Sequence, residues 1–120
     1  MVLVDTNVWI NHFRKADAEL VANLNTGSVA CHPFIIGELA CGNLKNREEI
    51  LELFQSLPSS PTVEPDELLT FIESRSLMGK GLGYVDVHLL ASAVLAGIPL
   101  WTSDTRLRRI SQDLGILYGR

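Results

Sequence analysis

The sequence predicts an α/β protein: a three-layer fold in which a central, mostly parallel sheet is flanked by helices. Two observations support this fold class. Short apolar segments rich in branched residues alternate with amphipathic segments through much of the 120 residues. The apolar segments are also continuously apolar rather than alternating, which is typical of strands that are buried on both faces of a parallel sheet.

The first quarter of the chain predicts two strands and two helices. VLVD at residues 2–5 indicates a buried strand that ends on a carboxylate. Residues 6–14 (TNVWINHFR) predict a helix, because their apolar side chains are spaced for one helical face. Residues 16–27 predict a second helix that stops at the segment Asn25–Gly27. SVACH at residues 28–32 predicts the second strand.

The middle of the chain predicts two more helices before the next strand. Pro33 opens the helix expected at residues 33–44, since proline is accepted in a first helical turn. Residues 46–57 (NREEILELFQSL) have a clear amphipathic pattern and predict the next helix. PSSP at residues 58–61 indicates a turn. TVEP at residues 62–65 is a short strand candidate that its proline weakens.

The remaining residues return to alternating helices and strands. Residues 66–81 predict a helix that glycines end, and residues 83–97 predict the most apolar helix, whose small residues permit close packing. IPLWTSD at residues 98–104 predicts a strand that again ends on hydroxyls and a carboxylate. Residues 105–115 predict a surface helix, and residues 116–118 predict a final strand.

Length and composition restrict the class of protein. A chain of 120 residues suggests one domain spanning residues 1–120, and 47% apolar residues argue against disorder. Cys31 and Cys41 match neither a metal-ligand pattern nor a disulfide framework, so we expect buried free thiols in a reducing compartment. No apolar run of about eighteen residues and no signal-peptide pattern occurs, so we expect a cytoplasmic protein without a membrane span.

Four acids lie in apolar segments, where an unpaired carboxylate is costly. Asp5 and Asp104 follow predicted strands, Glu38 is the lone charge of FIIGELACG, and Asp86 is the lone acid of YVDVHLLASAV. The carboxyl ends of parallel strands form functional sites, and converging acids repel unless a cation offsets them. Mg²⁺ or Mn²⁺ prefers oxygen ligands, so this set indicates metal-assisted phosphodiester hydrolysis. Taken singly, each acid has a simpler explanation as a helix cap or a solvent-facing residue.

The four motifs VLVDTNVWI, FIIGELACG, YVDVHLLASAV and LWTSDTRL resemble those of PIN domains, in the same order and over essentially the whole chain. More narrowly, the chain resembles the VapC toxin ribonucleases of bacterial toxin–antitoxin pairs. The resemblance implies an endoribonuclease dependent on Mg²⁺ or Mn²⁺, and its acidic set would be Asp5, Glu38, Asp86 and Asp104. It also implies a transfer RNA or ribosomal RNA substrate, a VapB-like antitoxin and a homodimer.

Polar and basic neighbours of the acids are candidates for supporting roles. Thr6 and Asn7 would orient Asp5 or hold a metal-bound water, unless they only cap a helix. Thr102 and Ser103 would do the same for the acid after them, although Ser103 stands where the resembled family often has a basic residue. The candidates for contact with RNA phosphates are Lys80, Arg106, Arg108 and Arg109. For the arginines, the alternative is a solvated helix face.

Two other classes of function remain open. A receiver-like signalling domain also gathers acids at parallel strand ends, but it needs a pair of adjacent acids after the first strand, and VLVDTN offers one. A catalytically silent RNA-binding or partner-binding domain of the same fold would need no acid set. The four acids argue against this second alternative without excluding it.

Overall fold

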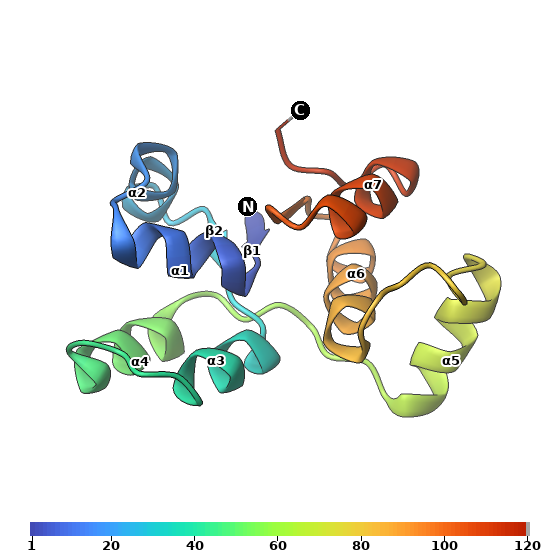
Figure 1. Cartoon of the computed structure of the whole chain (residues 1–120), viewed down its shortest axis with the longest axis horizontal. Coiled ribbons are helices and arrows are strands. Elements are labelled where there is room, and N and C mark those ends of the chain that lie inside the picture. The colour runs from blue at the N-terminus through green and yellow to red at the C-terminus, as the bar shows by residue number, and fades with distance from the viewer. Residues whose placement is uncertain (120) are drawn as a thin grey trace.

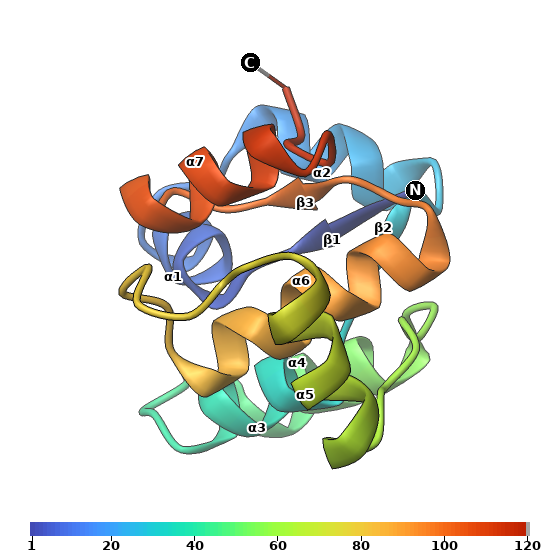
Figure 2. The same cartoon turned by 90° about the vertical axis from the view of Figure 1, so that its right-hand side faces the viewer.

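A computed structural model describes residues 1–119 of the chain and has three layers (Figures 1 and 2). The sheet lies in the middle, with α2 and α7 on one side of it and α3, α4, α5 and α6 on the other. The predicted α/β fold class is confirmed. The strands are β1 (Val2–Val4), β2 (Val29–Ala30) and β3 (Leu100–Trp101). The helices are α1 (Thr6–Arg14), α2 (Ala18–Asn25), α3 (Pro33–Ala40), α4 (Arg47–Ser56), α5 (Pro65–Ser74), α6 (Tyr84–Ala96) and α7 (Thr105–Asp113).

The central strand β1 pairs in parallel with both of its neighbours, in the order β2-β1-β3. Leu3 pairs with Ala30 on one side and with Leu100 on the other. Isolated parallel bridges extend the sheet, from Cys31 to Ser59 and from Leu100 to Leu117. The chain therefore leaves β1 toward one edge and later returns to the other, and the carboxyl end of β1 is the topological switch point where parallel sheets form their crevice.

Four expected elements differ markedly from the structure, and one is the helix expected at residues 33–44, which ends at Ala40 as α3. The strand prediction for residues 62–65 is wrong: Pro65 opens α5, and the side chain of Glu67 accepts a hydrogen bond from the backbone N–H of Glu64. Helix α5 ends at Ser74 rather than at the glycines, because the chain takes a positive φ of 52° at Ser76. Of the predicted strand at residues 116–118, only the Leu117 bridge forms.

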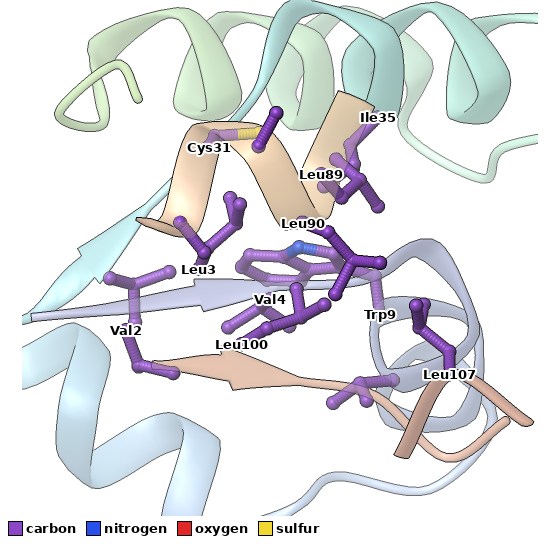
Figure 3. Packing of buried hydrophobic residues seen from close by; sticks show 14 of the residues in the cluster. Val2, Leu3, Val4, Trp9, Cys31, Ile35, Leu89, Leu90, Leu100 and Leu107 are labelled. Carbon is purple, nitrogen blue, oxygen red and sulfur yellow. The ribbon is translucent and has the colours of Figure 1, made fainter. Parts of the chain in front are cut away.

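The core lies on both sides of the sheet, and Figure 3 shows its part around the strands and α6. The Trp9 ring lies among side chains from the strands and α6, is 1% exposed, and meets Phe54 edge-on at 4.7 Å between ring centroids. Cys31 is buried as predicted, whereas Cys41 at the end of α3 is exposed, so the expectation of two buried thiols is wrong for Cys41. In the described part of the chain, no helix is long and apolar enough to span a bilayer.

Candidate active site

The carboxylate of Asp5 lies at the carboxyl end of β1 and is only 6% exposed. It caps α1, because Oδ1 accepts a hydrogen bond from the backbone N–H of Thr6 at 2.7 Å. Oδ2 accepts from the Thr102 hydroxyl at 2.8 Å and from Nδ2 of Asn7 at 3.1 Å. Three donors from two strand ends therefore fix the orientation of this carboxylate.

The surroundings of Asp5 act on its pKa in opposite directions. Burial raises the pKa above the ordinary value of 3.8, and the hydrogen bonds from Thr102 and Thr6 lower it. The negative charges of Asp86 and Glu38 raise it further, which shows that these three acids share one region. A cation beside these carboxylates would offset the charges of Asp86 and Glu38 that raise this pKa.

Glu38 and Asp86 reach this region from two other helices, and each has a local donor. The Thr6 hydroxyl donates to Oε1 of Glu38 at 2.7 Å, which ties α3 to the start of α1. Oδ2 of Asp86 accepts from the backbone N–H of Gly83 at 2.9 Å and so caps α6. Asp5 and Asp86 therefore do cap helices, as the simpler explanation requires. Both carboxylates also lie close enough for the charge of Asp86 to raise the pKa of Asp5, so capping does not exclude a shared site.

Asp104 is connected to the site less directly than the other three acids. Its Oδ1 accepts from the backbone N–H of Leu107 at 2.9 Å and caps α7. Its own N–H donates to Oγ1 of Thr102 at 3.1 Å, and the same hydroxyl donates to Asp5. Asp104 is not among the charges that shift the Asp5 pKa. The structure therefore brings three of the predicted acids together and links the fourth through Thr102.

The supporting residues form a hydrogen-bonded bridge between the ends of β1 and β3. Oδ1 of Asn7 accepts from the backbone N–H of Ser103 at 3.0 Å, and Nδ2 of Asn7 donates to Thr102 at 3.2 Å as well as to Asp5. Thr6, Asn7 and Thr102 thus contact acids with their side chains. Ser103 is exposed, and its backbone N–H makes the contact with Asn7.

The donor chemistry of the acids fits a hard cation, but their side chains do not form a ready-made coordination group. Within residues 1–119, no three or more His, Cys, Asp or Glu side chains are placed to hold one metal ion. Instead the carboxylates of Glu38, Asp86 and Asp104 turn to hydroxyl or backbone donors, which separates like charges. Oxygen-only ligands are what Mg²⁺ and Mn²⁺ prefer, so the donor chemistry of these residues suits such an ion.

Two of the predicted RNA-binding residues, Arg106 and Arg108, contact different parts of the chain. The Arg106 side chain lies against the glycine-rich loop that carries Lys80, and a Cβ on Gly81 would come within 3.1 Å of Nη1 of Arg106. Gly81 also has a φ of +76°, which favours glycine. Arg108 instead donates to the backbone oxygen of Thr102 at 3.2 Å. The contact between α7 and the glycine-rich loop was not predicted. The three glycines of MGKGLG are the feature of the sequence that could have indicated a close approach of another side chain.

The PIN domain family model matches residues 2–113. The chain belongs to the PIN domain family. Ribonuclease VapC32 of Mycobacterium tuberculosis is 46% identical to this PIN domain over 117 residues, covering 97% of this chain and 94% of the relative. Ribonuclease VapC1 of Methanocaldococcus jannaschii is 23% identical over 118 residues, covering 96% and 84%. Among solved structures, FitAB bound to an IR36 DNA fragment superposes with a TM-score of 0.62 at 20% identity, covering 93% of this chain and 91% of the other, and supports the fold alone.

This PIN domain also buries two histidines, His32 and His88. His88 follows Asp86 on α6 and is only 3% exposed, and its ring lies 6.4 Å from that of His32 between centroids. Burial lowers the pKa of His32 to about 4 and also lowers that of His88. Both rings are therefore neutral at pH 7 and pack with Phe34, so they do not balance the charge of the acids.

Proposed function

We propose that this PIN domain is a metal-dependent endoribonuclease that acts as the toxin of a VapBC-type toxin–antitoxin pair. The observation that carries the proposal is the buried Asp5 carboxylate, whose pKa is raised by burial and by the charges of Asp86 and Glu38. RNA as the substrate is supported by the relative named Ribonuclease VapC32, which matches nearly the full length of the chain. The reaction is hydrolysis of a phosphodiester bond, with a transfer RNA or a ribosomal RNA as the substrate class.

The proposed ligands of the metal, Mg²⁺ or Mn²⁺, are Asp5, Glu38, Asp86 and Asp104. Such an ion, when bound, makes a water more acidic and offsets negative charge on phosphate oxygens. The chain itself supplies orientation. Thr102 holds Oδ2 of Asp5 and the backbone N–H of Asp104 with one hydroxyl, so a fixed spacing between these two acids is built into the fold. The N-termini of α1 and α6 add partial positive charge beside Asp5 and Asp86.

The proposed partner is a VapB-like antitoxin that blocks the acids with a basic side chain. A guanidinium among carboxylates would compete with the metal and occupy the place of a phosphate. The helix after Asp5 carries Trp9 and Phe13, of which Trp9 is 1% exposed and Phe13 is 39% exposed. Of these two, only Phe13 offers a surface for a partner. A cytoplasmic homodimer is part of the same proposal.

Purified protein incubated with RNA tests the catalytic part of the proposal. We expect cleavage with Mg²⁺ or Mn²⁺, little with Ca²⁺, and none with EDTA. The substitution Asp5→Asn should abolish cleavage, whereas Asp66→Asn, an exposed acid in the first turn of α5, should not. Equal activity of Asp5→Asn and the unmodified protein would refute the proposed site.

Co-expression with the product of the adjacent upstream gene tests the toxin role. We expect growth arrest by this chain alone, rescue by the upstream product, and no arrest with Asp5→Asn. A lack of arrest in cells that contain folded protein would contradict the toxin role.

One observation favours a second candidate function, a catalytically silent RNA-binding PIN-like module. Within residues 1–119, no three acids, histidines or cysteines are placed to hold a metal ion. Under this alternative, the protein would bind RNA equally well with and without Mg²⁺ and would not cleave it. Cleavage that EDTA abolishes would exclude it.

A further inference from the structure

Two neighbouring hollows lie along one face of α7, and Arg108 lines both. The larger, with a volume of about 410 Å³, is lined by Glu19, Trp101, Arg108, Tyr118 and Gly119. The smaller, about 250 Å³, is lined by Thr105, Arg108, Arg109, Gln112 and Leu117. The α7 residues among them recur at helical spacing, so they share one face of that helix. The C-terminal segment runs beside α7 on the same side of the sheet (Figures 1 and 2).

These hollows lead away from the acid site. Thr105 is the first residue of α7 and follows Asp104 directly, so the smaller hollow begins at the edge of the site. Arg108 then connects it to the larger hollow, while its guanidinium also donates to the backbone oxygen of Thr102. A chain lying in both hollows would therefore pass Arg109 and Arg108 on its way from the acids to Trp101.

The larger hollow contains an aromatic pair that is oriented before any ligand binds. The rings of Trp101 and Tyr118 stack with 4.8 Å between centroids and 28° between planes. The Tyr118 hydroxyl accepts a hydrogen bond from Nδ2 of Asn23 at 2.9 Å, and its hydrogen bond to the Glu19 carboxylate raises the pKa of Tyr118, so Glu19 is held beside the pair. Both aromatic residues are partly exposed, whereas Leu100, which precedes Trp101 on β3, is fully buried. The pair is thus held by β3 and α2 and still presents ring surface to the hollow.

We infer that the larger hollow binds an unpaired nucleobase of the RNA by stacking on the Trp101–Tyr118 pair. Base stacking on aromatic rings is how proteins hold single-stranded nucleic acid, and arginines beside the rings meet its phosphates. The volume is also within the range of about 300–1,000 Å³ that is usual for small-ligand sites. This inference rests on the proposed ribonuclease function, and it adds a site for RNA that lies away from the cleaved bond.

The chemistry of Glu19 selects the kind of base. A carboxylate accepts hydrogen bonds from base N–H groups and repels phosphate, so it places the base rather than the backbone in the larger hollow. Guanine presents two adjacent kinds of N–H donor on its Watson–Crick edge, whereas uracil presents one. Guanine is therefore the expected base.

Tryptophan fluorescence of the full chain in EDTA tests the site without any cleavage. The chain has two tryptophans, and Trp9 is 1% exposed, so quenching by an added nucleotide reports on Trp101. We expect GMP to quench saturably and more strongly than UMP, and Glu19→Gln to remove that preference. Tyr118→Ala should weaken GMP binding about tenfold. Tyr84→Ala replaces the other tyrosine, which does not line the hollow, and should bind GMP as the unmodified chain does.

A kinetic measurement on the active enzyme separates this inference from the proposed function. Tyr118→Ala should raise KM for single-stranded RNA about tenfold and leave kcat unchanged. Tyr118→Phe keeps the stacked ring but removes the hydroxyl that bonds Asn23 and Glu19, so its KM should lie well below that of Tyr118→Ala. Absence of nucleotide quenching, or equal quenching by inorganic phosphate, would overturn the inference even if the chain cleaves RNA. Quenching that persists in a chain without ribonuclease activity would overturn only the proposed function. If Tyr118→Ala does not fold, an unchanged GMP preference in Glu19→Gln would overturn the inference.

Discussion

The hydroxyl of Thr102 donates a 2.8 Å hydrogen bond to Oδ2 of Asp5 and thereby joins the carboxyl end of β3 to that of β1. Thr102 is fully buried, and its hydroxyl oxygen also accepts from the backbone N–H of Asp104. One side chain therefore sets the positions of two of the four proposed catalytic acids. This relationship makes Thr102 the first residue to test.

Replacing Thr102 with valine keeps the shape of the side chain and removes its hydroxyl. Asp5 then loses a donor in a buried setting, so we expect a loss of about 1–3 kcal/mol in the free energy of unfolding. The pKa of Asp5 should rise further, because that hydrogen bond lowers it. Urea denaturation measures the first effect, and the acidic limb of the activity profile, shifted to higher pH, measures the second. Thr70→Val, at an exposed position on α5, is the control and should change neither.

The raised pKa of Asp5 predicts how stability depends on pH in EDTA. Because the folded pKa lies above the ordinary value of 3.8, folding favours the protonated carboxyl. Its contribution to stability is fully present below pH 3.8 and is lost as the pH rises through the folded pKa. The stability of Asp5→Asn relative to the unmodified protein should therefore increase over that pH range, as measured by chemical denaturation at each pH. A difference that stays constant with pH would show that Asp5 does not titrate as its surroundings require.

Bound metal should stabilise the unmodified protein relative to Asp5→Asn, which is opposite to the effect of raising the pH in EDTA. We expect Mg²⁺ or Mn²⁺ to raise the melting temperature of the unmodified protein above its value in EDTA, because the ion binds the folded state and offsets repulsion among the acids. Asp5→Asn should show little of this rise in a thermal melt. Asp66→Asn should respond to metal as the unmodified protein does, and an equal response of all three proteins would mean that metal binds elsewhere.

Two substitutions at Asp104 separate its structural role from its proposed catalytic one. Asparagine caps a helix as well as aspartate, so Asp104→Asn should keep the stability of the protein and lose RNA cleavage. Asp104→Ala should lose cleavage and also about 1 kcal/mol of stability, since Leu107 loses its cap. Thermal melts and a cleavage assay give both readings. Full cleavage by Asp104→Asn would show that Asp104 only caps α7 and takes no part in catalysis.

The contact of Arg106 with the loop of Lys80 and Gly81 predicts a shared effect on RNA binding. We expect Arg106→Ala and Lys80→Ala each to weaken RNA binding and to reduce the slope of log affinity against log salt by about one. Fluorescence anisotropy with labelled RNA in EDTA provides the measurement. Lys45→Ala, an exposed lysine before α4, is the matched control and should leave the slope unchanged.

Much of the local structure could be predicted because burial and helix capping are encoded over a few neighbouring residues. VLV predicts a strand buried on both faces, and Val2, Leu3 and Val4 are at most 2% exposed. Residues 6–14 predict a helix whose bounds match α1. The strand expected at residues 62–65 failed because capping by Glu67 favoured a helix start over a marginal β segment. The exposure of Cys41 depends on how α3 packs, which its apolar neighbours do not reveal.

The sequence by itself determined the fold class and singled out four candidate acids, because a lone carboxylate in an apolar segment stands out without any knowledge of its neighbours. Only the tertiary structure decided which of those acids lie close together. The pairing of Val4 with Trp101 places Asp5 beside Thr102, and sheet register is a long-range property that neither segment carries alone. The packing of α3 and α6 then brings Glu38 and Asp86 near Asp5, while the capping bond to Leu107 directs Asp104 toward its own helix.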